Sequence, residues 1–178
     1  MSFNKLGLSP ALLKSIQAKG YSNPSEIQQE AIPEILKGKD ILAGAQTGTG
    51  KTAAFALPIL HRLQNAESKR RRVRVLVLVP TRELASQVGE SFRDYGSNLR
   101  FRISVLYGGV SINTQIDKIR KGVDIVVATP GRLLDHLNQK TLKLSELETF
   151  VLDEADRMLD MGFIRDIKKI LQYLPDEK

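Results

Sequence analysis

The sequence predicts a doubly wound α/β domain, in which a parallel sheet carries helices on both faces. Two observations favour this fold class. Short apolar runs alternate along the chain with segments whose apolar residues recur at helical spacing. The apolar runs also lack polar alternation, which is typical of strands that are covered on both faces. Strands and helices that alternate, with short loops at the strand ends, are typical of a doubly wound sheet.

Two helices are expected before the first glycine-rich turn. One begins at Ser9-Pro10, with a capping serine and a first-position proline, and ends at Gly20. The next has Asn23 as its cap, and Glu26 is placed to close a capping box. Pro33 should kink or split this second helix.

Strand and helix patterns alternate through the rest of the chain. Strands are expected at 74–79, 102–107, 124–128 and 150–152, because each is a short apolar run. Helices are expected between and after them, because apolar residues recur at helical spacing. Those residues are Leu84, Ala85, Val88, Phe92, Tyr95, Ile112, Ile116, Ile119, Leu133, Leu134, Leu137, Ile164, Ile167, Ile170, Leu171 and Leu174.

Composition narrows the class of protein. The chain has 178 residues, 42% of them hydrophobic and 26% charged, which suits one globular domain with a proper core. It has no cysteine and only two histidines, far apart, so disulfides and a zinc site are not expected. No run is long enough to span a membrane and no signal peptide is visible, so we expect a cytoplasmic protein.

A net charge of +7 suits a polyanionic partner. Part of this charge lies in the polar segment 67–72, which contains Lys69 and three arginines. We expect a solvated, mobile surface loop there. Contact between this loop and RNA phosphates is the alternative.

A glycine-rich turn lies between the apolar run 41–43 and a helical pattern at 53–57. Its residues are Gly44, Ala45, Gln46, Thr47, Gly48, Thr49, Gly50, Lys51 and Thr52. A triphosphate requires this order of strand, loop, Lys-Thr and helix, because glycines let backbone N–H groups point at phosphate oxygens. Lys51 can reach the β- and γ-phosphates, and Thr52 can ligate Mg²⁺. Ala45 replaces the first glycine of the general pattern, and a simple helix-capping turn is the alternative.

Two carboxylates, Asp153 and Glu154, follow the apolar run 150–152. In a phosphate-loop ATPase, the aspartate at a strand end holds Mg²⁺, often through water, and the next glutamate polarises the attacking water. The alternative is that the two acids only cap the next helix. Several strand–helix units separate them from Lys51, which is the order that a phosphate-loop fold requires, so the ATPase interpretation is favoured.

These motifs bring out a family resemblance. Residues 153–156 read Asp-Glu-Ala-Asp, and residues 45–52 match one family's version of the phosphate loop, with its alanine. The chain resembles the N-terminal RecA-like domain of a DEAD-box RNA helicase, most of all the bacterial RhlE group, from about Phe3 to the last residues, and we take 1–178 as that domain. The resemblance implies a RecA-like P-loop NTPase domain that uses ATP and Mg²⁺.

The first residues look like the family's adenine-recognition motif, at about 3–28. By resemblance Gln28 hydrogen-bonds the adenine edge, Phe3 packs on the ring, and Tyr21 belongs to the same motif. A carboxamide offers the donor and acceptor that adenine requires. The alternatives are a solvent-facing helix position for Gln28 and a core or staple contact for Phe3.

Three further motifs match the family's RNA contacts. Their residues are Pro80, Thr81, Arg82, Glu83, Gly108, Gly109, Thr129, Pro130, Gly131 and Arg132. Each motif follows an expected strand, so all three should share the carboxyl edge of the sheet. Hydroxyls, helix N-termini and arginines bind the phosphate backbone and do not read bases, so RNA binding should be largely sequence-independent. Internal salt bridges are the alternative for Arg82 and Arg132.

The family's next motif, Ser-Ala-Thr, and its second RecA-like domain are not in this sequence. In RecA-like ATPases the strand leading to that motif lies between the loop strand and the Asp-Glu strand, so we expect a fragment whose sheet lacks a central strand. By resemblance Asp156 and Arg157 couple to the second domain, which supplies arginines to the γ-phosphate. We therefore expect weak nucleotide binding and no unwinding from this chain alone. We also expect a monomer.

Three functions follow, in this order. The first is an ATP-dependent RNA helicase that acts on single-stranded or duplex RNA, with Lys51, Asp153 and Glu154 as its catalytic residues. The second is another phosphate-loop enzyme, such as a DNA helicase or a small-molecule kinase, against which the Gln28 motif argues. The third is a non-catalytic module that binds RNA or a partner, and such a module would not depend on Lys51.

Overall fold

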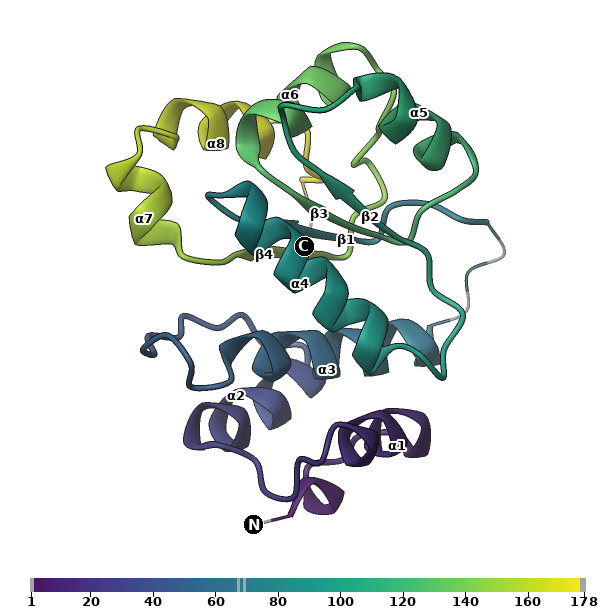
Figure 1. Cartoon of the computed structure of the whole chain (residues 1–178), viewed down its shortest axis with the longest axis vertical. Coiled ribbons are helices and arrows are strands. Elements are labelled where there is room, and N and C mark those ends of the chain that lie inside the picture. Colours follow the sequence, from purple (N-terminus) through teal and green to yellow (C-terminus); the bar gives the residue numbers. More distant parts are fainter. Residues whose placement is uncertain (1, 67, 69, 177–178) are drawn as a thin grey trace. The chain divides into compact units, whose positions relative to one another are not determined.

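The computed structural model describes residues 2–66, 68 and 70–176 (Figure 1). The chain forms two compact units. Unit 1 comprises Met1–Ser68 and Glu90–Arg100, and unit 2 comprises Lys69–Gly89 and Phe101–Lys178. Unit 1 therefore carries the glycine-rich turn, and unit 2 carries the acidic pair. The single domain expected over 1–178 stays a prediction.

Unit 2 is built on a parallel sheet, which has four strands in the described part of the chain. In chain order these are β1 (Val75–Leu78), β2 (Ile103–Leu106), β3 (Ile125–Ala128) and β4 (Thr149–Leu152). Across the sheet the order is β2-β3-β1-β4, and each neighbouring pair runs parallel. The α/β class with a parallel sheet is confirmed, and these strands are the ones that the sequence predicts after the glycine-rich turn.

The position of each strand explains its sequence pattern. Every residue of the central strands β1 and β3 is buried. Strand β2, at one edge, alternates between buried and half-buried residues, and β4, at the other edge, is half-buried to exposed. A central parallel strand is covered on both faces, which accounts for the continuous apolar runs of β1 and β3.

Helices follow each strand of unit 2. They are α4 (Arg82–Tyr95), α5 (Ile112–Arg120), α6 (Pro130–Asn138), α7 (Ala155–Asp160) and α8 (Ile164–Leu171). Helix α4 begins in unit 2 and ends in unit 1. Helical spacing of apolar residues predicts α4, α5, α6 and α8 correctly. Helix α7 is not predicted as a separate helix from the sequence.

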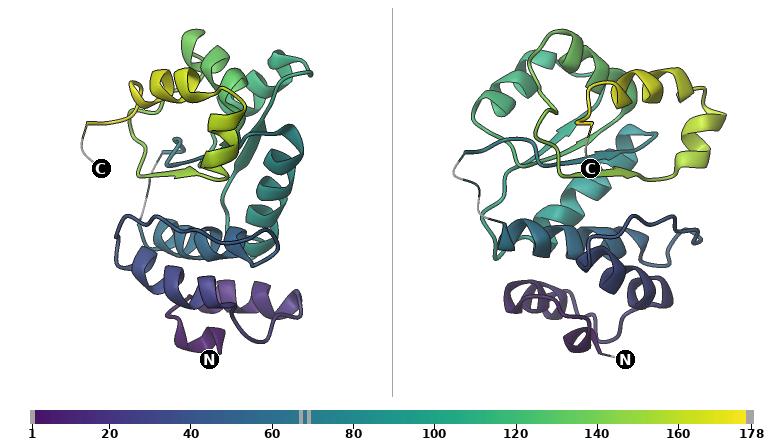
Figure 2. Two further views of the ribbon diagram at one scale, coloured as in Figure 1. Left: turned by 90° about the vertical axis from the view of Figure 1, so that its left-hand side faces the viewer. Right: turned by 180° about the vertical axis from the view of Figure 1, so that it is seen from behind.

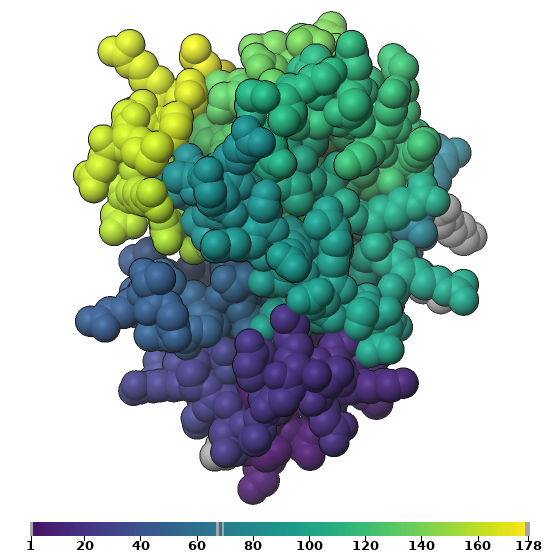
Figure 3. All heavy atoms as spheres, viewed as in Figure 1, coloured from purple at the N-terminus to yellow at the C-terminus, as the bar shows by residue number. Residues whose placement is uncertain are grey.

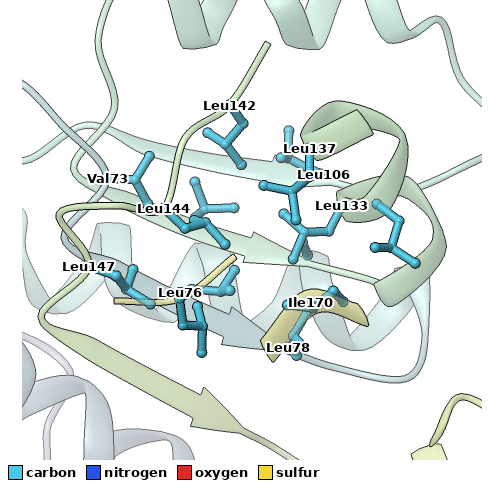
Figure 4. Close-up of a cluster of buried hydrophobic side chains, with 14 of the residues drawn as sticks. Val73, Leu76, Leu78, Leu106, Leu133, Leu137, Leu142, Leu144, Leu147 and Ile170 are labelled. Atoms are coloured by element: carbon cyan, nitrogen blue, oxygen red, sulfur yellow. The ribbon is translucent and has the colours of Figure 1, made fainter. Parts of the chain in front are cut away.

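One hydrophobic cluster lies between the sheet and the helices α6 and α8 (Figure 4). Leu76 and Leu78 contribute from β1, because alternate residues of a strand point to the same face. Helices α6 and α8 pack against each other above them. Members labelled in Figure 4 are Val73, Leu76, Leu78, Leu106, Leu133, Leu137, Leu142, Leu144, Leu147 and Ile170.

Unit 1 is helical. It contains the 3₁₀ turn η1 (Phe3–Lys5), α1 (Pro10–Ala18), α2 (Glu26–Leu36) and α3 (Lys51–Asn65). Helices α2 and α3 lie side by side in both views of Figure 2. The backbone N–H of Ser9 donates to His61 Nδ1 at 3.1 Å and ties the start of α1 to α3. The rings of Phe55 and Phe92, 6.2 Å apart, tie α3 to the second half of α4.

Residues 41–43, which the sequence predicts as a strand, do not form one. Leu42 is fully exposed, and 40% of Ile41 is exposed. A strand needs a neighbour to satisfy its N–H and C=O groups, and 41–43 pair with none of the strands of the sheet. The prediction of a strand at this position is therefore wrong.

The predicted details of α2 also need correction. The helix runs without a break through Pro33, so the expected split is wrong. Its N-cap is Ser25 and not Asn23, and the side chain that reaches back to the cap is Gln28 and not Glu26. The predicted motif is displaced by two residues, because both Asn23 and Ser25 are suitable caps.

Two arginines of the basic link 67–72 form ion pairs. Positions 67 and 69 lie outside the described residues. Arg71 Nη1 lies 2.6 Å from Asp124 Oδ2, and Arg72 Nη1 lies 2.5 Å from Glu146 Oε1. Both side chains are still more than a third exposed and lie in no helix or strand, as a solvated surface loop requires, and the mobility of the link stays a prediction.

Several apolar side chains are exposed on the C-terminal helices. Helices α7 and α8, yellow-green to yellow, lie at the surface in Figure 3. Their exposed side chains, with those of the short segments after them, are Leu159, Met161, Ile164, Leu171 and Tyr173. Among the described residues, no helix combines the length and hydropathy that crossing a membrane requires.

The core predicts a clear difference between two leucines. Leu133 on α6 is 0% exposed, and we expect Leu133→Ala to lower the free energy of unfolding by about 2–5 kcal/mol, because it leaves a cavity. Leu171→Ala on α8, where 43% of the side chain is exposed, is the matched control and should change it by less than about 1 kcal/mol. Urea unfolding followed by circular dichroism measures both. Equal losses would contradict this assignment of the core.

Candidate functional site

The glycine-rich turn of unit 1 leads directly into α3. Gly48 and Gly50 both have φ of +84°, and Gly50 is the N-cap of α3. Such left-handed positions favour glycine, and they turn the backbone so that N–H groups converge on one side. The first N–H groups of a helix also lack intrahelical partners, and they carry the positive end of its dipole. This geometry suits a phosphate.

The other residues of the turn are open or half-buried. Gln46, Thr47 and Gly48 are exposed, and the hydroxyl of Thr49 donates to the carbonyl oxygen of Gln46 at 2.6 Å. Ala45, Thr49, Gly50, Lys51 and Thr52 are half-buried. Lys140 and Glu154 are the non-glycine residues with positive φ in the described part of the chain, so Ala45 adopts an ordinary φ. The backbone at position 45 therefore does not require the glycine of the general pattern.

Gln28 packs against this turn. Its Oε1 accepts from the Ser25 backbone N–H at 3.0 Å, and its Nε2 donates to the Gly50 carbonyl oxygen at 3.1 Å. Only 7% of Gln28 is exposed. The solvent-facing alternative for Gln28 is therefore wrong. A Cβ atom at Gly50 would lie 2.3 Å from Gln28 Nε2, so a larger residue there would displace the Gln28 amide, and the left-handed φ independently favours glycine.

Phe3 and Tyr21 line a different feature of unit 1. Both border a pocket of about 550 Å³ beside α1. Phe3 is 5% exposed and belongs to the core, as the alternative for this residue proposes, whereas half of Tyr21 is exposed. Burial, together with the charge and hydrogen bond of Tyr21, raises the pKa of Tyr95 to about 12. The structure thus groups Phe3 with Tyr21 and joins Gln28 to the glycine-rich turn.

In unit 2 the register of the sheet aligns the strand ends. Leu78 of β1 pairs with Ala128 of β3 and Leu152 of β4, and Ala128 pairs with Leu106 of β2. Backbone hydrogen bonds of 2.9–3.0 Å extend the ladders by one residue, from the N–H groups of Val79, Thr129 and Asp153 to the carbonyl oxygens of Ala128, Leu106 and Leu78. The motifs after the four strands therefore meet at one carboxyl edge, as the sequence predicts.

The motif after β1 caps α4 and presents an arginine. The Leu84 backbone N–H donates to Thr81 Oγ1 at 3.2 Å, whereas Pro80 is buried, Glu83 is exposed and Arg82 is exposed. The guanidinium of Arg82 lies 4.8 Å from the centre of the Tyr107 ring, within reach of a cation–π interaction. The structure places Arg82 on an aromatic ring, not in the internal salt bridge of the alternative.

The loop after β2 lies against the same arginine. Gly108 and Gly109 are exposed, and Gly109 has φ of +80°. A Cβ atom at Gly109 would lie 3.2 Å from Arg82 Nη1. Glycine at this position therefore permits both the left-handed turn and the close approach of Arg82.

Arg132, in the motif after β3, points inward. Its Nη1 donates to the Val110 carbonyl oxygen at 3.0 Å and to Gln115 Oε1 at 3.1 Å, and its Nε lies 3.7 Å from Asp135 Oδ2. Only 12% of its side chain is exposed. Thr129 is the N-cap of α6, Pro130 is buried and Gly131 is exposed. The internal-partner alternative therefore describes Arg132 correctly in this structure.

The acidic pair after β4 lies at the start of α7. Asp153 is 9% exposed, and Glu154 is the N-cap of α7 with φ of +55°. A glutamate rarely adopts this left-handed conformation, and such strain is often found at functional positions. Glu154 Oε2 lies 3.2 Å from Arg157 Nη1, and Asp156 is exposed. Glu154 thus stands at the N-cap position but makes no side-chain capping hydrogen bond, and the catalytic roles of the pair stay a prediction.

The two halves of the predicted ATP site belong to different units. Lys51 and Thr52 lie in unit 1, and Asp153 and Glu154 lie in unit 2. Their convergence on one Mg²⁺ ion stays a prediction. The part of the chain that the structure describes holds no cluster of three or more histidine, cysteine, aspartate or glutamate residues that could bind a metal without a further ligand.

Two polar residues at this edge were missed by the sequence analysis. Gln115 on α5 is 6% exposed and His136 on α6 is 0% exposed, and both belong to the hydrogen-bond network of Arg132. A weak signal for His136 is its spacing of four residues from Arg132, which puts both on one side of α6. Gln115 gives no such signal, because its partners come from other segments.

A first prediction at this site concerns Gly50. We expect Gly50→Ala to lower the free energy of unfolding by about 2–3 kcal/mol, because a left-handed alanine is strained and the methyl group displaces the Gln28 amide. Gly48→Ala is the matched control, with the same φ and no atom within 4 Å of its added Cβ, and should cost about 1–2 kcal/mol. In a Gln28→Ala background the difference should shrink. Equal effects of the two glycine variants in thermal or urea unfolding would refute the close packing.

A second prediction concerns pH. Burial, and next the Arg132 charge, lower the pKa of His136 from its ordinary 6.5, against a smaller opposite effect of Asp135, and burial also lowers the pKa of His61. The unfolded chain then binds more protons than the folded chain below about pH 6.5, so stability should fall as the pH decreases through that range. His136→Gln and His61→Gln should each flatten this dependence in urea titrations from pH 7.5 to 5. An unchanged slope in His136→Gln would show that its pKa is not lowered.

Comparisons with known proteins agree with these motifs. The DEAD/DEAH box helicase profile matches residues 25–178. The chain is 51% identical over 175 residues to the DEAD-box ATP-dependent RNA helicase CshA of Bacillus cereus, covering 98% of this chain and 33% of that protein. It is 48% identical over 176 residues to the DEAD-box ATP-dependent RNA helicase RhpA of Helicobacter pylori, covering 99% of this chain and 35% of that protein.

A third relative, the ATP-dependent RNA helicase CshA of Limosilactobacillus reuteri, is 46% identical over 178 residues, which cover 100% of this chain and 35% of that protein. The chain thus spans about a third of the length of the curated relatives that it matches. The finer resemblance to the RhlE group stays a prediction. On the match of residues 25–178 and these identities, the chain belongs to the DEAD/DEAH box helicase family.

Proposed function

We propose that this chain is the ATP-binding N-terminal part of an ATP-dependent RNA helicase. The observation that carries the proposal is the aligned register of the sheet. It brings the segments after β1, β2 and β3, which match RNA-contacting motifs, to the same edge as Asp153-Glu154 after β4. A helicase needs these motifs close together, because ATP hydrolysis at one motif must change the affinity of the others for RNA. The names of the relatives support the same activity.

The proposed nucleotide-binding function depends on residues of unit 1. The left-handed glycines and the N-terminus of α3 fit a phosphate chain, and Lys51 is the cation at that point. Gln28 uses one lone pair of Oε1 and one hydrogen of Nε2 internally, so it keeps a second of each for an adenine edge. The roles of Phe3 and Tyr21 in packing against the base follow from the resemblance alone.

The proposed hydrolytic residues come from both units. Thr52 and Asp153, the latter partly through water, are the proposed Mg²⁺ ligands, and the ion would neutralise phosphate charge. Glu154 is the proposed general base that orients and polarises the attacking water. Glu154 has a left-handed backbone, which is unusual for glutamate, and its carboxylate forms an ion pair with Arg157 at 3.2 Å. Asp156 and Arg157 are proposed to couple this segment to a second RecA-like domain.

The proposed RNA-binding residues lie in unit 2. Arg82 is exposed on the Tyr107 ring, so its charge is available to a phosphate, and Gly108-Gly109 lets a backbone approach closely. Thr81, Thr129 and the first turns of α4 and α6 add hydroxyl and N–H donors. These groups recognise phosphate and sugar, so the proposed partner is single-stranded or duplex RNA of any sequence.

The test is RNA-stimulated ATP hydrolysis by the protein at its natural length. We expect single-stranded RNA, but not DNA of the same sequence, to raise the rate. Lys51→Ala should lower kcat/KM for ATP by at least about 100-fold, because the phosphates lose their cation. Glu154→Gln should lower kcat by about 100-fold or more with little effect on nucleotide binding. Lys168→Ala, an exposed lysine on α8, is the control and should behave as wild type.

Each other outcome selects a different function. Equal stimulation by DNA would favour a DNA helicase, and RNA-independent phosphoryl transfer to a small molecule would favour a kinase. RNA binding without any ATP hydrolysis, unaffected by Lys51→Ala, would leave a non-catalytic binding module.

A further inference from the structure

A buried polar network joins the segments at the carboxyl edge of unit 2. Its centre is Gln115 on α5, whose Oε1 lies 2.9 Å from His136 Nε2 and accepts from Arg132 Nη1 at 3.1 Å. On its other side, Gln115 Nε2 donates to the Tyr107 carbonyl oxygen at 3.0 Å. One amide therefore contacts the helix after β3 and the loop after β2.

The loop 107–110 is held at both ends by this network. Gln115 binds its first carbonyl, at Tyr107, and Arg132 Nη1 binds its last, at Val110, at 3.0 Å. Gly108 and Gly109 lie between these two anchors. The ring of Tyr107 in turn supports the guanidinium of Arg82, so the segment after β1 depends on the same loop.

The donors and acceptors fit in one arrangement. If the Gln115 amide were reversed, its NH₂ group would face the N–H donors of Arg132 and its oxygen would face the Tyr107 carbonyl, and both contacts would be repulsive. Because Oε1 only accepts, His136 must carry its proton on Nε2. His136 Nδ1 lies 2.8 Å from Thr141 Oγ1, and that hydroxyl also donates to the His136 carbonyl oxygen at 3.1 Å.

We infer that Gln115 and His136 are positioning residues that set the geometry of loop 107–110 and Arg82, and through them the affinity of the protein for the RNA backbone. This inference rests on the proposed function. Gln115 is 6% exposed and His136 0% exposed, and their hydrogen bonds given above are all to protein groups, so we assign them no direct contact with RNA. They act by fixing groups that do. A fixed loop loses less conformational freedom when RNA binds, which strengthens binding.

The experiment measures the Kd for a fluorescently labelled single-stranded RNA, and the KM values for RNA and ATP, with the protein at its natural length. Gln115→Met keeps the length of the side chain but removes its hydrogen bonds, and should raise the Kd and KM for RNA roughly five- to tenfold. The KM for ATP and the RNA-independent hydrolysis rate should not change. Gln172→Met, an exposed glutamine after α8, is the matched control and should match wild type.

A second pair of variants separates positioning from folding. His136→Leu removes the donor to Gln115 and should weaken RNA binding to a similar extent. His136→Gln places an amide N–H near the position of Nε2–H and should restore binding to within about threefold of wild type. A purely structural role would instead lower unfolding stability and affect ATP and RNA alike. If Gln115→Met does not fold, the comparison of His136→Leu with His136→Gln tests the inference instead.

The outcomes separate this inference from the proposed function. Wild-type RNA binding with normal affinity in folded Gln115→Met and His136→Leu would overturn the inference alone. Parallel losses of ATP and RNA binding, or failure of His136→Gln to restore binding, would also overturn it. If the wild-type protein bound no RNA, the proposed function would fail and the inference with it.

Discussion

The alignment of four parallel strand ends is the constraint on which unit 2 depends. Backbone pairing fixes Leu78, Leu106, Ala128 and Leu152 in register, so every turn that follows a strand starts from the same edge. This register is maintained because β1 and β3 are buried on both faces, where a slip would leave backbone groups unpaired away from water. The apolar strands therefore determine where the polar motifs lie, although they contain none of the proposed chemistry.

The alignment of the strands does not determine how the side chains at that edge are oriented. Local contacts orient two arginines. Arg82 is placed by the Tyr107 ring, and Arg132 by the Val110 carbonyl and by Gln115. A buried polar network of this kind stabilises only when every member has its partner. In this network Arg132 Nη1 and the Gln115 amide are hydrogen-bonded, whereas Arg132 Nε is buried without a hydrogen-bond partner among the described residues. Glu154, between β4 and α7, has a left-handed backbone that glutamate rarely adopts.

Much of this structure could be predicted from local sequence. The four strands of the sheet, four of the helices after them and the glycine-rich turn all follow from apolar spacing and from residue types whose preferences are local. Contacts between distant residues could not be predicted in this way. The bond from Gln28 to Gly50, the ring of Tyr107 under Arg82 and the inward turn of Arg132 each join segments that are far apart in sequence. Cap choice failed for a different reason, because Asn23 and Ser25 compete for one helix start.

Residues 41–43 show why a strand is not a local property. Ile41 and Leu42 have the β-branched and apolar composition of a strand, and the glycine-rich turn follows as expected, yet no strand forms. Strand β4 is an edge strand of the described sheet, and residues 41–43 pair with none of its strands. Because the hydrogen bonds of a strand are made with its neighbours, apolar composition alone does not make residues 41–43 a strand.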